Sequence, residues 1–335
     1  MLWDDHPMAG SADHIKALLR SHADRDDASF YAVASQIAAQ EARRGHSRLA
    51  GELKEMIDAA RQLPFERGSS GVTPIARPRG ELSELVSASY PEVGIEDMVA
   101  SAELAAQIGE ILAEQRQRRV LAERGFDPVH RILLEGPPGT GKTMTAAVLA
   151  HELSLPLLTV RLDSVLSKFL GETGSKLRLL FDAVREQRAV YLFDEFDALG
   201  AERTGNDVGE ARRILNSFLV FLDQAGPDSV VVAATNHSAI LDRALFRRFD
   251  MAIHYKLPTA AEAREVLRSR LGPMGKGLSW SGSPSAKQLK DLSHAELVKV
   301  AESAAKGALI DGFDRVEKNR LDGALLARRG AAKRG

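Results

Sequence analysis

A glycine-rich stretch, GPPGTGKT at residues 136 to 143, carries the most specific chemistry in this sequence. It matches the pattern G-x-x-x-x-G-K-[ST], which cradles the phosphates of a nucleotide where it follows a strand and opens a helix. Its glycines let the backbone curl until successive N–H groups point at phosphate oxygens, above the positive end of the next helix. Lys142 would reach the β- and γ-phosphates, and Thr143 would bind Mg²⁺. The predicted phosphate site consists of Gly136, Pro137, Pro138, Gly139, Thr140, Gly141, Lys142 and Thr143.

A pair of acids, Asp194 and Glu195, follows the apolar run AVYLF at residues 189 to 193. A buried strand would carry both acids to the carboxyl edge of a parallel sheet, where ligands of open α/β sheets bind. There Asp194 would hold the Mg²⁺ shell, and Glu195 would polarise the water that attacks the γ-phosphate. An isolated acid pair after a strand is often a solvated turn, but the preceding phosphate loop favours the catalytic interpretation.

A polar residue, Asn236, ends a second apolar run, SVVVAAT at residues 229 to 235. An asparagine after a strand is usually a turn residue. Beside a phosphate site, its amide would instead hold the attacking water and sense the γ-phosphate.

Two adjacent arginines, Arg247 and Arg248, occur in the stretch LDRALFRRFD at residues 241 to 250. Arginine pairs are ordinarily surface charges. The alternative is an arginine finger, a guanidinium that stabilises the charge on the transferring phosphate and can come from another subunit.

Five short apolar runs rich in β-formers would position these residues. They alternate with helical patterns, which predicts βαβ units and a parallel sheet covered by helices on both faces. We therefore expect an α/β fold, a five-stranded parallel P-loop NTPase domain over residues 82–257. The predicted strands are 131–135, 157–161, 189–193, 229–234 and 252–256.

Helical patterns flank this domain on both sides. Apolar spacing predicts three short helices and a small N-terminal helical domain over residues 1–63, followed by a linker over 64–81 that is rich in Pro, Gly and Ser. Beyond Pro258 we expect a small helical domain, with a basic tail, over residues 258–335. Its predicted helices are 259–271, 285–291, 293–310 and 318–329.

Composition limits the classes of function. With 335 residues, of which 44% are hydrophobic, the chain is long enough for two or three packed domains. A net charge of −1 provides no overall basic field, which argues against nucleic acid or an anionic membrane as partner. The absence of cysteine excludes disulfides, thiol catalysis and cysteine-ligated metal sites. The N-terminus lacks a signal-peptide pattern and no apolar run is long enough to cross a bilayer, so we expect a cytoplasmic protein.

The order of these motifs, from the phosphate loop through DEFD and AATN to ALFRRFD, resembles the AAA branch of the AAA+ ATPases over residues 90 to 329. The resemblance implies ATP and Mg²⁺ as ligands, a helical lid after the P-loop domain, and nucleotide bound between the subunits of a homo-oligomeric ring, usually a hexamer. It also implies that Arg247 and Arg248 reach the ATP of the neighbouring subunit. Most relatives separate the two arginines by Pro-Gly, so which one contacts phosphate stays open.

The adenine pocket follows from the resemblance alone. By analogy, adenine would lie near Met98 and Val99, where the Asp-x-Gly-Gly motif of the family is replaced by VGIEDMVAS. His294 replaces a glycine of the family in the lid segment SHAEL. It would approach adenine or ribose, or else simply lie at the start of a helix.

The segment SKFLGETG, at residues 167 to 174, resembles the loop that faces the central pore in this family. Lys168, Phe169 and Leu170 would then grip an unfolded polypeptide, whereas without a ring Phe169 would pack as ordinary core. The resemblance implies ATP hydrolysis coupled to unfolding, threading or disassembly of a protein substrate. Two alternatives stay open: a switch that regulates a partner without threading it, and a nucleic-acid motor or loader.

The stretch QIAAQEARRGHSRLAGEL, at residues 36 to 53, is similar to the start of small bacterial AAA ATPases associated with a subtilisin-like protease and with defence against phage. The N-terminal helices would recruit a substrate or a partner, because members of the family vary most there. The similarity implies that the partner is such a protease.

Overall fold

The computed structural model describes residues 80–166, 170–199, 208–237 and 243–332, together with ten separate positions nearer the N-terminus. The chain divides into two units, Met1–Thr73 and Pro74–Gly335. In the first unit the described residues, which include Val33 and Ile37, are helical except for His46. Most of the three predicted N-terminal helices lies outside the described residues.

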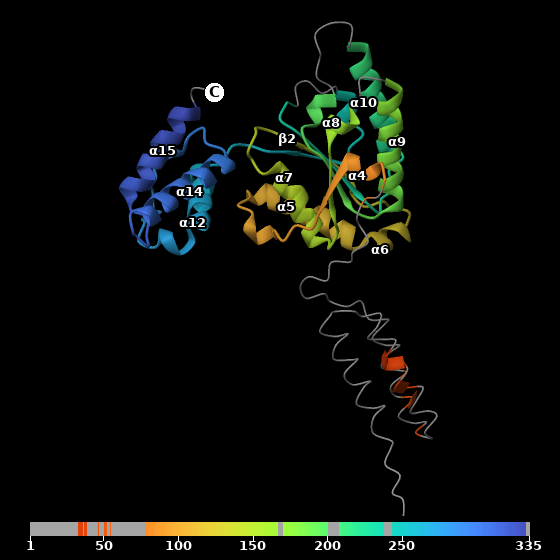
Figure 1. The fold of residues 1–335 in the computed structure, drawn as a ribbon, viewed down its shortest axis with the longest axis horizontal. Helices are drawn as coiled ribbons and strands as arrows, with labels where there is room; N and C mark the ends of the chain where they lie inside the picture. Colours follow the sequence, from red (N-terminus) through yellow and green to blue (C-terminus); the bar gives the residue numbers. More distant parts are fainter. Residues whose placement is uncertain are drawn as a thin grey trace, which may run out of the picture. The chain divides into compact units, whose positions relative to one another are not determined.

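The second unit is built on a six-stranded sheet in the order β1-β3-β4-β5-β2-β6 (Figure 1). The five predicted strands are confirmed, and β2 to β6 all pair in parallel. The expectation of five strands was one short, because β1 pairs antiparallel with β3 at the edge of the sheet. Only one of the four residues of β1 is buried, and its sequence, VSAS, contains no apolar run that would have predicted a strand. The strands are Val86–Ser89 (β1), Arg131–Glu135 (β2), Leu157–Val160 (β3), Val190–Phe193 (β4), Val230–Thr235 (β5) and Met251–His254 (β6).

Helices cover both faces of this sheet (Figure 1). One face packs against Leu170–Glu186 (α9) and Val208–Asp223 (α10), and the other against Ala102–Arg116 (α5) and Lys142–Glu152 (α7). Successive strand residues point to opposite faces, as Tyr191 and Leu192 do, so each central strand is apolar along its whole length. The shorter helices are Leu82–Leu85 (α4), Arg118–Ala122 (α6), Leu162–Val165 (α8) and Arg243–Phe246 (α11).

A helical domain follows β6, as predicted, and has its own apolar core. Capping boxes fix two of its helix starts: Thr259 pairs with Glu262, and Ser293 pairs with Glu296. Its helices are Ala260–Leu271 (α12), Ala286–Leu289 (α13), His294–Ile310 (α14) and Lys318–Ala332 (α15). Among the described residues of the whole chain, no helix is both long and apolar enough to span a membrane.

Candidate active site

Three neighbouring strands end at one edge of the sheet, which we call the carboxyl edge. β5 lies between β4 and β2, so the segments that follow these three strands are adjacent in space. The phosphate loop (residues 136–143) follows β2, and its first N–H, from Gly136, donates to the carbonyl of Thr235 at the end of β5, at 3.3 Å. The acid pair follows β4, and Asn236 follows β5. The fold therefore gathers the predicted phosphate, acid and amide groups at one place.

The phosphate loop has the curled backbone that anion binding requires. Gly136, Gly139 and Gly141 all have positive φ angles, of 142°, 72° and 105°. At Gly136 a side chain is excluded by space as well, because a Cβ atom would lie 2.4 Å from the carbonyl oxygen of Tyr255. Helix α7 starts at Lys142, within the last two residues of the loop, so its N-terminal N–H groups continue the curled backbone.

Lys142 lies inside the loop rather than in solvent. Its ammonium donates to the carbonyl oxygens of Gly136 and Pro137, both at 2.8 Å, and only 6% of the residue is exposed. Burial lowers the pKa of Lys142, and the nearby carboxylates of Asp194 and Asp197 partly oppose this shift. The two hydrogen bonds hold the Lys142 side chain at the centre of the loop, where a positive charge would stabilise phosphate charge most strongly.

The two residues expected to hold Mg²⁺ contact each other. The hydroxyl of Thr143 donates to Asp194 Oδ2 at 2.7 Å. These hard oxygen donors fit Mg²⁺, which takes one or two protein ligands and completes its shell with water and substrate phosphates. No cluster of three or more His, Asp or Glu that could hold a metal ion occurs in the part of the chain that the structure describes.

Glu195 combines an exposed side chain with an unusual backbone conformation. It is exposed, and its φ angle is +52°, a left-handed conformation that non-glycine residues rarely adopt. The backbone N–H of Glu195 donates to Asp194 Oδ1 at 2.9 Å, which fixes the turn between the two acids. Strain of this kind concentrates at functional sites, where the surrounding structure holds it in place.

Asp197, which was not among the predicted site residues, joins the candidate site. Its Oδ1 accepts from the hydroxyl of Thr235 at 2.9 Å and from the backbone N–H of Asn236 at 3.4 Å. Asp197 therefore connects the segment after β4 to the end of β5 and positions Asn236 beside the acid pair. The signal was present as the last letter of DEFD, but its partner is 38 residues away in sequence.

The residues predicted for the adenine pocket approach the phosphate loop from two sides. Met98 lies 3.5 Å from the position of a Cβ on Gly141. His294, at the start of α14, hydrogen-bonds to the backbone of Val99, and burial lowers its pKa. Its Nδ1 is buried and has no partner among the described residues. The next residue, Ala295, donates its N–H to the carbonyl of Gly139 at 3.0 Å, so the lid touches the loop directly.

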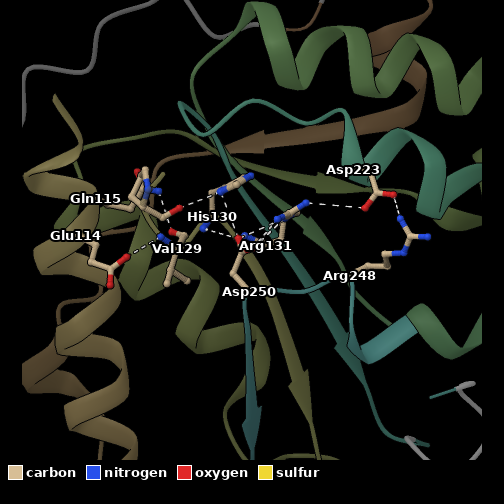
Figure 2. Close-up of polar contacts among 9 residues, drawn as sticks. Glu114, Gln115, Val129, His130, Arg131, Asp223, Arg248 and Asp250 are labelled. Atoms are coloured by element: carbon tan, nitrogen blue, oxygen red, sulfur yellow. Dashed lines mark hydrogen bonds and ion pairs between the residues drawn. The ribbon is translucent and has the colours of Figure 1, made fainter. Parts of the chain in front are cut away.

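The two arginines lie at the opposite end of the strands, which we call the amino edge. They precede β6, which runs parallel to β2, and the N–H of Asp250 donates to the carbonyl of Arg131, the first residue of β2, at 2.8 Å. Figure 2 shows Arg248 near this start of β2. The phosphate loop begins five residues after Arg131, about 16 Å further along the strand. The structure therefore separates Arg247 and Arg248 from the other predicted catalytic residues.

Comparison with known proteins identifies the family. The model of the "ATPase family associated with various cellular activities (AAA)" matches residues 132–257. The AAA family ATPase y4kL of Sinorhizobium fredii is 33% identical over 314 residues, 93% of this chain and 93% of that protein. The chain belongs to the AAA family of ATPases. Its ATP hydrolase activity and nucleotide binding follow from this membership.

Other similar proteins agree with this AAA assignment. The ATP-dependent zinc metalloprotease FtsH of Parabacteroides distasonis is 31% identical over 75% of this chain, but the match covers only 38% of that protein. A putative 26S proteasome regulatory subunit homolog of Methanothermobacter marburgensis is 31% identical over 59% of this chain and 54% of its own length. The crystal structure of the FIGL-1 AAA domain superposes with a TM-score of 0.56 at 26% identity, covering 73% of this chain and 86% of that one.

One group of predicted AAA residues cannot be placed. Lys168 and Phe169 lie outside the described residues. Leu170 is the first residue of α9, but its side chain is not described. The substrate-gripping role of these residues stays a prediction.

Proposed function

We propose that this AAA ATPase assembles into a homo-oligomeric ring, a hexamer, that uses ATP hydrolysis to unfold, thread or disassemble proteins. The observation that carries the proposal is the separation of the catalytic groups onto opposite edges of one sheet. Arg247 and Arg248 are a strand's length from the phosphate loop of their own chain. A second copy that presents its amino edge to the carboxyl edge of the first would complete the site.

Each residue at the carboxyl edge has a role in this scheme. Lys142 and the N–H groups of the phosphate loop bind the β- and γ-phosphates of ATP. Thr143 and Asp194 hold Mg²⁺, which supplies positive charge to the phosphates when bound. Glu195 accepts a proton from the attacking water, and Asn236, positioned by Asp197, orients that water.

A protein substrate is supported by the similar proteins and by sequence. One relative is named as a metalloprotease and another as a proteasome regulatory subunit, and both names concern proteins as substrates. A single-strand nucleic-acid motor needs a basic groove and stacking aromatic side chains, and a net charge of −1 with an aromatic content of 5% gives no support for either. We therefore favour the protein-directed motor over a nucleic-acid motor. A switch that does not thread its partner is the remaining alternative.

Complementation between two inactive variants tests the shared site. Glu195→Gln lacks the base and Arg247→Ala lacks an arginine, so each should hydrolyse ATP at least about 100-fold more slowly than the wild type. Mixed rings should regain part of the activity, because some sites then pair an intact Glu195 with an intact Arg247. A mixture as inactive as its components, at several mixing ratios, would contradict the shared site. Mass photometry of Glu195→Gln with and without ATP reports the size of the ring.

Loss of the aromatic residue of the predicted pore loop tests the threading motor. Phe169→Ala should abolish ATP-dependent unfolding of a fluorescent protein that carries an unstructured tail, whereas ATP hydrolysis should continue. An unchanged unfolding rate would exclude threading through this loop and favour the switch.

Partnership with a subtilisin-like protease, and a part in defence against phage, stay predictions. Most of residues 36–53, whose similarity implies this partnership, lie outside the described residues. Capture of such a protease from the source cell by residues 1–80 would support it.

A further inference from the structure

The two adjacent arginines differ in their surroundings, and the difference assigns them different roles. We propose that Arg247 alone enters the site of the neighbouring copy, and that Arg248 is a positioning residue held by Asp223 of its own chain. This inference rests on the proposed ring, because it concerns how the arginines complete a shared site.

Arg248 is already paired within its own subunit. Its guanidinium forms a charge-assisted hydrogen bond and ion pair with Oδ2 of Asp223, the last residue of α10 (Figure 2). The other oxygen of that carboxylate lies 3.9 Å from the guanidinium of Arg131. If Arg248 turned away to reach a phosphate, Asp223 would lose its direct partner and keep only the longer contact.

The pair belongs to a larger network that fixes the amino edge. Arg131 forms a bidentate ion pair with Asp250, with its Nη2 at 2.6 Å from Oδ1. Asp250 Oδ2 also accepts from the backbone N–H groups of His130 and Arg131, at 3.1 and 2.9 Å. Burial alone would raise the pKa of Asp250, but these hydrogen bonds outweigh it and the pKa lies below its usual value. Asp223, Arg131 and Asp250 thus join α10, β2 and the start of β6 in one charged cluster.

The backbone around the arginines is fixed on both sides. Leu245 and Phe249 are buried in the same apolar core, with 0% and 7% of each residue exposed. The N–H of Arg248 donates to the carbonyl of Leu245 at 3.0 Å, which closes the turn between them. Leu245 and Phe249 thus anchor the turn at both ends, and Arg248 ties it to Asp223. The backbone of Arg247 is therefore held in a defined position.

Arg247 is that remaining side chain. It is exposed, and among the described residues its guanidinium makes no hydrogen bond or ion pair. A free guanidinium on a rigid turn suits a group that must meet phosphate charge without first breaking a contact in its own chain. The cluster therefore lets Arg247, and not Arg248, act in trans.

Lysine substitutions separate the two roles, because lysine retains the charge but not the planar fork of arginine. Arg248→Lys can still pair with Asp223, so we expect kcat for ATP to fall by no more than about threefold. Arg247→Lys should lower kcat at least about 100-fold, since an arginine finger depends on its guanidinium geometry. ATP affinity should stay within about twofold for Arg248→Lys, because Arg248 touches no nucleotide in this scheme. For Arg247→Lys it should fall much less than kcat, because an arginine finger acts mainly on the charge of the transition state.

A double-mutant cycle tests whether Arg248 acts through Asp223. Arg248→Ala and Asp223→Asn should each lower kcat about tenfold by loosening the turn, and the double variant should still be only about tenfold slower. If Arg248 contacts phosphate independently, the two losses should multiply to about 100-fold. Thermal unfolding of each variant, with and without ATP, checks that the proteins are folded.

The outcomes also distinguish this inference from the proposed function. If Arg247→Lys and Arg248→Lys both hydrolyse ATP at the wild-type rate, the shared site itself is wrong. If only Arg248→Lys loses activity, the shared site stands and the roles assigned to the two arginines are wrong. Equal losses in the two lysine variants, or multiplied losses in the cycle, would leave the ring intact and overturn the division of roles between Arg247 and Arg248.

Discussion

At the carboxyl edge of the sheet the side chain of Glu195 is exposed on a left-handed backbone, whereas at the amino edge Asp250 is held by a guanidinium and two backbone N–H groups. The first arrangement leaves a carboxylate ready for a ligand at a cost in backbone strain. The second uses a carboxylate to join two strands. The contrast suggests that the charged cluster of the amino edge stabilises the fold, apart from the exposed Arg247, and that the carboxyl edge keeps Glu195 available for chemistry.

Replacing Lys142 gives the largest expected effect and belongs to the carboxyl edge. Lys142→Met should weaken ATP binding at least about 100-fold, which corresponds to about 2.7 kcal/mol. The free energy of unfolding should change by less than about 1 kcal/mol, because the lost hydrogen bonds to two carbonyls are offset by removal of a buried charge. Titration with a fluorescent ATP analogue and urea unfolding measure the two quantities. A strongly destabilised variant would show that this edge also stabilises the fold.

Replacing Asp250, at the amino edge, should lower the stability of the fold and leave ATP affinity nearly unchanged. Asp250→Asn keeps the size of the side chain but faces an amide toward Arg131, so the free energy of unfolding should fall by about 2 kcal/mol. ATP affinity should stay within about twofold, since the phosphate loop is at the other end of β2. The same two measurements apply. If Asp250→Asn lost ATP affinity but not stability, the two edges would not differ in the way proposed.

The pH dependence of stability gives the smallest effect. The pKa of Asp250 lies below 3.8 in the folded chain, so its contribution is present above that ordinary value and is lost as the pH falls through the folded pKa. The difference in unfolding free energy between the wild type and Asp250→Asn should therefore shrink below pH 3.8. Urea unfolding at pH 7 and at successively lower pH values measures it. A difference that does not depend on pH would mean that the charge of Asp250 is not what stabilises this edge.

The sequence predicted the carboxyl edge better than the amino edge, for a physical reason. The phosphate loop and the acid pair are contiguous motifs, and the parallel pairing of apolar strands is enough to bring them together. The contact between Arg248 and Asp223 joins residues 25 apart, and that between Arg131 and Asp250 joins residues 119 apart. No local sequence pattern marks such pairs, because a charged residue that forms a distant ion pair cannot be told from an unpaired surface charge by its neighbours in sequence. Strand β1 was not predicted either. It lies at the edge of the sheet with one buried residue, so its sequence contains no apolar run.

The hydrogen bond from Ala295 to Gly139 has a consequence for mutational studies. It joins the lid to the phosphate loop through two backbone atoms, an N–H and a carbonyl, so no side-chain truncation removes it. An alanine scan reaches this connection only at Gly139, where an added Cβ would lie 2.8 Å from Ser293 Oγ and 3.0 Å from Ala295 Cβ. Gly139→Ala would therefore crowd the lid against the loop, whereas truncation of the neighbouring side chains would leave the hydrogen bond in place. A joint between domains that consists of main-chain atoms can thus be missed by a scan of side chains alone.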